Sequence, residues 1–211
     1  MEPCNLEQEK LGRTIIERAI RITEGRIQTS TEDKYISYKG KELLGLKHIK
    51  KFSHVPINGT GGILGEALFD LIYSRFVSLV PSNGDEDYKD GIDFFLNGFP
   101  IDVTTDLRGN NINKKVKPEK YTTILLPNRI NSPIAFPKEE DNNNPNEYIT
   151  HLLETGDIDI PQYMVDLYAI NFTMLEHLER HIWELESNGI RNAGLNNVTN
   201  LRTILELLPT P

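Results

Sequence analysis

The segment 91–105, GIDFFLNGFPIDVTT, constrains the fold more than any other part of this chain of 211 residues. Asn97-Gly98 stands between two runs of β-forming residues and favours a two-residue hairpin turn, because both central residues of a type I′ turn need a positive φ. With a two-residue loop at 97 and 98, residues whose numbers add up to 195 face each other across the hairpin. One face of the hairpin is then wholly apolar, formed by Ile92, Phe94, Leu96, Phe99, Ile101 and Val103. The two-residue alternation and the turn therefore predict the same register.

The opposite face of this hairpin carries acidic side chains. The same register places Asp93 directly across from Asp102, where β-carbons are about 4.5–5.5 Å apart and like charges destabilise a sheet. Such a pair is tolerated when one carboxylate is protonated or when a cation lies between them. A divalent metal is the economical cation, since Mg²⁺ commonly binds one or two carboxylates and keeps water and phosphate oxygens as other ligands. The alternative is an exposed face with two ordinary aspartates, although Phe95 and Pro100 indicate partial cover.

Periodicity in the rest of the chain predicts both helices and strands. Helices are expected over residues 6–24, 42–51, from the GTGG loop at 59–62 to about 80, and over 146–155, 172–187 and 199–208. Strands are expected over residues 34–39, 121–126 and 163–170. This order predicts an α/β fold with a mixed β-sheet flanked by helices. We expect one domain with an N-terminal helical and basic segment at 1–61, a core at 62–170 and C-terminal helices at 171–211.

Composition narrows the class of protein. The single cysteine, Cys4, excludes a disulfide framework and suits a reducing compartment. The first ten residues lack the apolar region of a secretory signal, so we expect a cytoplasmic protein. The most apolar stretch, 63–80, contains charged residues, which argues against a membrane partner.

The charge is unevenly placed along the chain. The net charge of −8 argues against bulk coating of nucleic acid, but residues 1–138 hold 20 basic and 18 acidic residues and the rest hold 3 and 13. Two lysine clusters lie in the first part, and the members expected to contact nucleic-acid phosphates are Lys47, Lys50, Lys51, Lys114, Lys115 and Lys117. For each cluster, a solvated lysine-rich loop is the alternative.

Two short motifs in the hairpin resemble those of a known family. Gly91-Ile92-Asp93, followed after a turn by Ile101-Asp102-Val103-Thr104-Thr105, resembles the PD-(D/E)XK nuclease superfamily, which has a restriction-endonuclease-like core. The expected element order over 62–170 is also similar to that core, in which a helix precedes the strands and a helix and strand follow.

The resemblance implies both a function and a set of site residues. It implies a divalent-metal-dependent DNA endonuclease, of restriction, mobile-element or phage type, that acts on double-stranded DNA as a homodimer. Asp93 and Asp102 would hold Mg²⁺, with Mn²⁺ as a substitute, and Glu66 on the preceding helix would assist them.

One position departs from the family pattern. Thr104 stands where the family has a lysine that orients the attacking water and offsets transition-state charge. Lys120, at the start of the next expected strand, is the first candidate to replace that lysine, with Lys89 and Lys115 behind it. Two other hypotheses remain: a catalytically silent nuclease-fold protein that binds DNA or a protein partner, and an α/β enzyme that uses the same carboxylates on another phosphorylated substrate.

Overall fold

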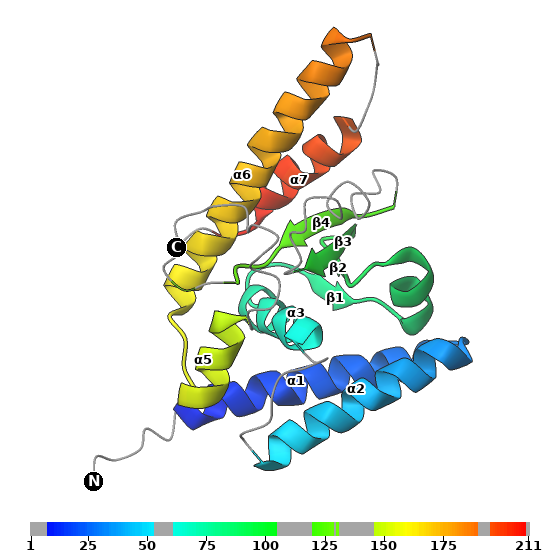
Figure 1. Ribbon diagram of the computed structural model, residues 1–211, viewed down its shortest axis with the longest axis vertical. Helices are drawn as coiled ribbons and strands as arrows, with labels where there is room; N and C mark the ends of the chain where they lie inside the picture. Colours follow the sequence, from blue (N-terminus) through cyan, green and yellow to red (C-terminus); the bar gives the residue numbers. More distant parts are fainter. Residues whose placement is uncertain are drawn as a thin grey trace.

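The computed structural model describes residues 8–52, 61–104, 120–128, 130, 146–189 and 195–209. Within these ranges the chain is mixed α/β, with helices on both sides of a four-stranded sheet (Figure 1). The helices are α1 (Gln8–Thr29), α2 (Asp33–Phe52), α3 (Gly61–Tyr73), the π-helix η1 (Glu86–Asp90), α5 (Glu147–Thr155), α6 (Ile160–Ser187) and α7 (Leu195–Leu207). The strands are β1 (Leu79–Pro81), β2 (Phe94–Leu96), β3 (Phe99–Thr104) and β4 (Thr122–Leu125). Among the helices in these ranges, none has the length and apolar character needed to cross a membrane.

The β2–β3 hairpin has the register predicted from its turn. Its pairs are Phe94 with Ile101, Phe95 with Pro100 and Leu96 with Phe99. Asn97 and Gly98 have φ values of 47° and 88°, both positive as the turn requires. Phe94, Leu96 and Ile101 are fully buried, so the apolar face lies in the core as expected.

The sheet has the order β1-β2-β3-β4, and it is mixed. β1 is antiparallel to β2, and β4 is parallel to β3. Figure 1 shows α3, α1 and α2 on one side of the sheet and α6 and α7 on the other. The side-chain amide of Asn171 on α6 accepts from the Leu125 N–H at 2.9 Å and donates to the Leu125 carbonyl at 2.8 Å, so it satisfies the backbone at the β4 edge.

Two of the predicted strands are wrong, because both segments are helical. Residues 34–39 lie in α2, where the buried side chains follow helical spacing: Tyr35, Lys39, Glu42, Leu46 and Ile49. Residues 163–170 lie in α6, whose buried side chains Tyr163, Leu167 and Asn171 are four residues apart. A short run of apolar and aromatic residues does not distinguish a strand from a buried helix. Both runs belong to helices of 20 or more residues, a length typical of helices and not of strands.

The other predicted elements are present with shifted ends. α3 ends at Tyr73 rather than near residue 80, because residues 79–81 join the sheet as β1. β4 falls within the strand expected at 121–126. α5 and α7 correspond to the helices expected at 146–155 and 199–208. β1 and η1 were not predicted, since three and five residues are too few to show a periodic pattern.

Candidate active site

Asp93 lies one residue before β2, at the open end of the hairpin. Gly91 has a φ of 70° and turns the chain out of η1, a conformation that suits glycine. The Asp93 N–H then donates to the Ile101 carbonyl at 2.9 Å, and Asp93 Oδ2 accepts from the Val103 N–H at 2.8 Å. Its carboxylate is therefore fixed against the β3 backbone.

Asp93 and Asp102 are close to each other, but they are not a regular cross-strand pair. The paired residues end at Phe94 and Ile101, one step short of them, which corrects the direct opposition expected from the sequence. Burial raises the pKa of Asp93 well above its ordinary value, and the negative charges of Glu66 and Asp102 raise it further. The positive charge of Arg26 opposes this rise, so the predicted repulsion between the acidic residues is present and is partly offset.

Arg26 of α1 is a buried cation that faces an acidic cluster formed by Glu66, Asp87 and Asp93. Its Nη1 lies 2.7 Å from Glu66 Oε2 and 3.4 Å from Asp87 Oδ2. Its Nη2 donates to the Asp93 carbonyl at 2.9 Å and lies 3.4 Å from Asp93 Oδ1. Burial lowers the pKa of Arg26, which is 1% exposed, but the charges of Glu66, Asp93 and Asp87 outweigh burial and raise it above its ordinary value. An arginine distant in sequence therefore supplies positive charge that sequence reasoning assigned to a metal.

A second buried cation, Lys39 of α2, extends the cluster. Its Nζ lies 3.1 Å from Glu42 Oε2 and 3.6 Å from Asp87 Oδ2, and the Tyr35 hydroxyl donates to the same Asp87 oxygen. Burial lowers the pKa of Lys39, but the nearby carboxylates raise it above its ordinary value. Burial raises the pKa of Glu42, with Lys39 opposing it and the charge of Glu66 adding to it. Two buried cations thus face four carboxylates, those of Glu42, Glu66, Asp87 and Asp93.

Tyr121, one residue before β4, lies near the two aspartates. Its ring leaves only 3.3 Å for a β-carbon at Gly91, so glycine permits this close approach. Burial raises the pKa of Tyr121 to about 12, with contributions from the charges of Asp102 and Asp93. Tyr121 therefore stays a neutral hydroxyl beside the aspartates.

Of the three lysines considered as substitutes for the lysine of the nuclease pattern, the two that the structure describes, Lys120 and Lys89, form ion pairs at the surface. Lys120 Nζ is 2.6 Å from Asp90 Oδ1, in a pair whose side chains are 48% and 41% exposed. Lys89 pairs at the surface with Asp85 and Glu32. Lys115 lies outside the described residues. The buried cations of the cluster come instead from α1 and α2.

The lysines expected to contact nucleic acid are described only in part. Lys47 is exposed on α2, with its Nζ 2.8 Å from Glu24 Oε1. The side chains of Lys50 and Lys51, and the whole of Lys114 and Lys117, fall outside the described residues.

The carboxylates fit a divalent cation held by two of them. Within the ranges that the structure describes, no group of three or more His, Cys, Asp or Glu side chains is arranged to hold a metal ion. Arg26 holds Glu66 Oε2 at 2.7 Å and Asp93 Oδ1 at 3.4 Å, and the charge of Asp102 still repels Asp93, a repulsion that a cation would relieve. Mg²⁺ needs no more than one or two protein carboxylates, so the pair is a chemically adequate donor set.

Sequence reasoning missed Arg26, although a signal for it exists. Ile15, Ala19, Ile22 and Arg26 follow helical spacing, and all four are buried. A cation on the apolar side of a helix is buried only when it is paired, so its phase in the helix predicts a carboxylate partner. Lys39 could not be found this way, because its segment was expected to be a strand.

The chain has no match among the protein-family models, the curated proteins or the solved structures with which it was compared.

Proposed function

We propose that this protein is a divalent-metal-dependent DNA endonuclease with a restriction-endonuclease-like core. The observation that carries the proposal is that Asp93, at the open end of a hairpin, feels the charge of Asp102 and is joined to Glu66 through Arg26. The order of elements supports it, because α3 precedes three antiparallel strands and β4 follows parallel to β3.

In this proposal Asp93 and Asp102 hold Mg²⁺, or Mn²⁺ in its place. The bound ion would supply Lewis-acid activation of water and stabilise charge on the scissile phosphate and the leaving oxygen. The Val103 N–H holds one oxygen of Asp93 in place. Arg26 fixes the Asp93 backbone and offsets the charge of Glu66, so that the acidic residues remain together in a buried position.

A plasmid assay with matched variants tests the proposal. We expect the purified protein to nick or linearise supercoiled DNA with Mg²⁺ or Mn²⁺, and Asp102→Asn to abolish this activity while leaving the fold intact. Asp90→Asn is the matched control, because Asp90 is a partly exposed carboxylate that pairs with Lys120 at the surface. Full activity of Asp102→Asn would reject the proposal.

A second candidate function is DNA or protein binding without hydrolysis. Two observations favour it: Arg26 already offsets the charges of Glu66 and Asp93, and Thr104 replaces the family lysine. In the same assay, binding of the plasmid with no cleavage at stoichiometric protein would support this candidate. Metal-dependent nicking that Asp102→Asn abolishes would reject it.

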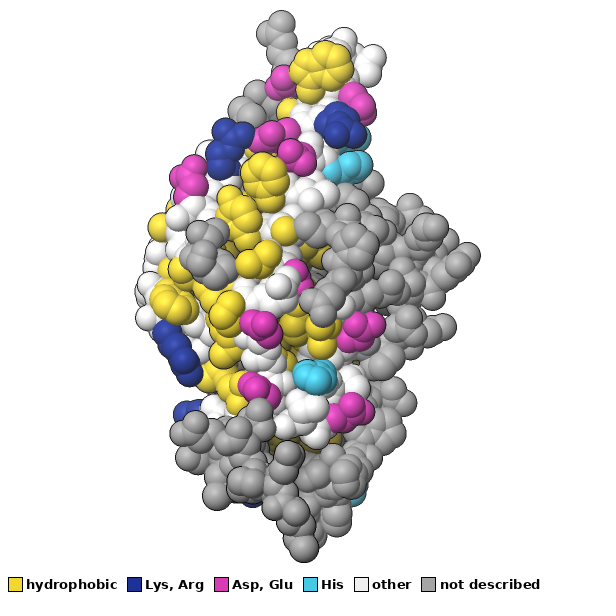
Figure 2. All heavy atoms as spheres, turned by 90° about the vertical axis from the view of Figure 1, so that its left-hand side faces the viewer, with side chains coloured by type: hydrophobic (Ala, Val, Ile, Leu, Met, Phe, Trp, Pro, Cys, Tyr) yellow, Lys and Arg dark blue, Asp and Glu magenta, His cyan; other side chains and the backbone are white. Residues whose placement is uncertain are grey.

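A homodimer is part of the proposal, and α6 offers the supporting surface. Val165, Phe172 and Trp183 on this helix are 45%, 43% and 68% exposed. Figure 2, which faces this side of the molecule, shows hydrophobic side chains gathered along it between charged ones. Light scattering after size exclusion would measure the mass, and Trp183→Glu would convert a dimer formed through α6 into a monomer.

A further inference from the structure

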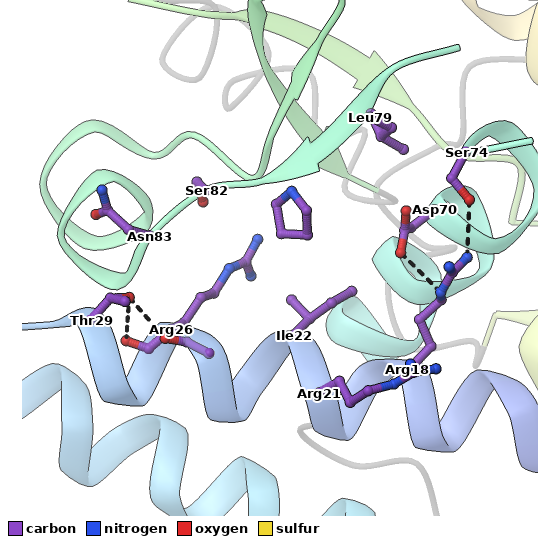
Figure 3. Close-up of a pocket in the computed structure, with 12 residues that line it drawn as sticks. Arg18, Arg21, Ile22, Arg26, Thr29, Asp70, Ser74, Leu79, Ser82 and Asn83 are labelled. Atoms are coloured by element: carbon purple, nitrogen blue, oxygen red, sulfur yellow. Dashed lines mark hydrogen bonds and ion pairs between the residues drawn. The ribbon is translucent and has the colours of Figure 1, made fainter. Parts of the chain in front are cut away.

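A groove of about 520 Å³ runs between α1 and the chain that leads from the end of α3 through β1 to Asn83 (Figure 3). Three arginines of α1 line it: Arg18, Arg21 and Arg26. Asp70, its sole lining carboxylate among the described residues, is held by Arg18, whose Nε lies 3.1 Å from Asp70 Oδ2. Arg21 is exposed, so the groove keeps a cation that can meet an incoming anion.

Two buried polar atoms in the groove lining make no hydrogen bond within the described residues. They are Arg26 Nε and Ser82 Oγ, in side chains of residues that are 1% and 4% exposed. Buried donors of this kind nearly always have an acceptor. Arg26 Nε and the Ser82 hydroxyl are both donors, and Arg21 adds a positive charge, so the chemistry of the groove fits an anion with several acceptor oxygens.

Arg26 joins this groove to the acidic cluster. Its Nη atoms contact Glu66 and Asp93, and the same side chain is part of the groove lining, with its Nε making no hydrogen bond within the described residues. In Figure 3 Arg26 and Ile22 rise from α1 towards β1 and Ser82. An anion seated here would lie one side chain away from the candidate catalytic carboxylates.

We propose that this groove binds a phosphate of the nucleic-acid backbone and so holds the substrate strand beside Asp93. The inference rests on the proposed function, because it says where the backbone of that substrate lies outside the reacting centre. Arg21 contributes charge, the Ser82 hydroxyl contributes a neutral hydrogen bond, and Arg26 couples the bound phosphate to the position of Asp93.

Binding of a short fluorescein-labelled DNA duplex in EDTA, followed by anisotropy, tests this groove without any cleavage step. Arg21→Ala should raise Kd roughly three- to tenfold near 0.1 M salt and lower the slope of log K against log salt by about 0.9, the value for one lost phosphate contact. Ser82→Ala should weaken binding with an unchanged slope, because the hydroxyl is neutral. Arg180→Ala on α6, also an exposed arginine, is the control and should change neither quantity.

The outcomes separate this inference from the nuclease proposal. Wild-type Kd and slope in both Arg21→Ala and Ser82→Ala, or no duplex binding by the wild type, would overturn the inference. Tighter binding of a mononucleotide than of the duplex would overturn it too, in favour of a small phosphorylated ligand. Duplex binding that depends on Arg21, together with a failure to cleave plasmid, would uphold the groove and reject the nuclease.

Discussion

Arg26 and Lys120 are both single cations facing carboxylates, yet their surroundings differ. Arg26 is 1% exposed and contacts three carboxylates, whereas Lys120 is about half exposed and pairs with Asp90. A buried charge that loses its partner keeps the full cost of desolvation, while an exposed pair is screened by water and salt. A cation whose position on a helix forces it into the core therefore affects stability more than a cation at the surface does.

The largest expected effect breaks the buried side of this comparison. Arg26→Met should lower the free energy of unfolding by about 3–5 kcal/mol, because it leaves Glu66 and Asp93 as buried charges without their counterion. Urea unfolding would measure this loss, and Lys120→Met is the matched control with an expected change of about 1 kcal/mol or less. Equal losses in the two variants would contradict the comparison.

A double-mutant cycle sharpens the assignment to charge. Glu66→Gln removes one carboxylate that Arg26 compensates, so Arg26→Met should cost less in a Glu66→Gln background than in the wild type. We expect a coupling of about 1–3 kcal/mol from urea unfolding of the four proteins. Additive effects would show that the charge of Glu66 contributes nothing to the stabilisation by Arg26.

The sequence predicted the elements whose signals are local. The Asn97-Gly98 turn and the alternation around it specify the β2–β3 register, and this prediction is confirmed. Residues 163–170 were misassigned because a buried helix and a buried strand have similar compositions over eight residues.

The candidate site was predictable only where it is local. Asp93 and Asp102 belong to one hairpin, so its predicted register was enough to predict that they are neighbours. The Arg26 contacts join residues 40 and 67 positions apart, and no local pattern specifies such a pairing. Only the helical phase of Arg26 indicated that it needs a buried partner.

Two further aspartates, one buried and one at the surface, make opposite contributions to the pH dependence of stability. Burial raises the pKa of Asp70, with Arg18 and Arg21 opposing, whereas hydrogen bonds from Thr31 and Lys89 lower the pKa of the partly exposed Asp85 to about 2. The folded protein therefore binds a proton at Asp70 more tightly than the unfolded chain does. Stability from this group is present at low pH and is lost as pH rises from 3.8 through the raised pKa, whereas the contribution of Asp85 is lost as pH falls from 3.8 towards 2.

Asp70→Asn tests the sign of that dependence. Unfolding free energies of wild type and variant, measured by urea across this pH range, should diverge as pH rises, with wild type losing about 1.4 kcal/mol for each unit by which the Asp70 pKa is raised. The difference should then stay constant at higher pH. A wild type that gains stability relative to Asp70→Asn as pH rises would contradict the assignment, because the Arg18 ion pair would then dominate over burial.

The smallest expected effect is the salt dependence of the free energy of unfolding, which should differ between variants of Lys120 and Arg26. Lys120→Ala should change the free energy of unfolding by about 0.2–1 kcal/mol in dilute buffer, and this change should shrink near 1 M salt, where the screening length falls to about 3 Å. The loss in Arg26→Met should persist at the same salt concentration, because ions do not enter the space around a side chain that is 1% exposed. If salt removed both effects, the Arg26 cluster would have to open to solvent readily, and the carboxylates it holds would then be accessible to a cation without any displacement of Arg26.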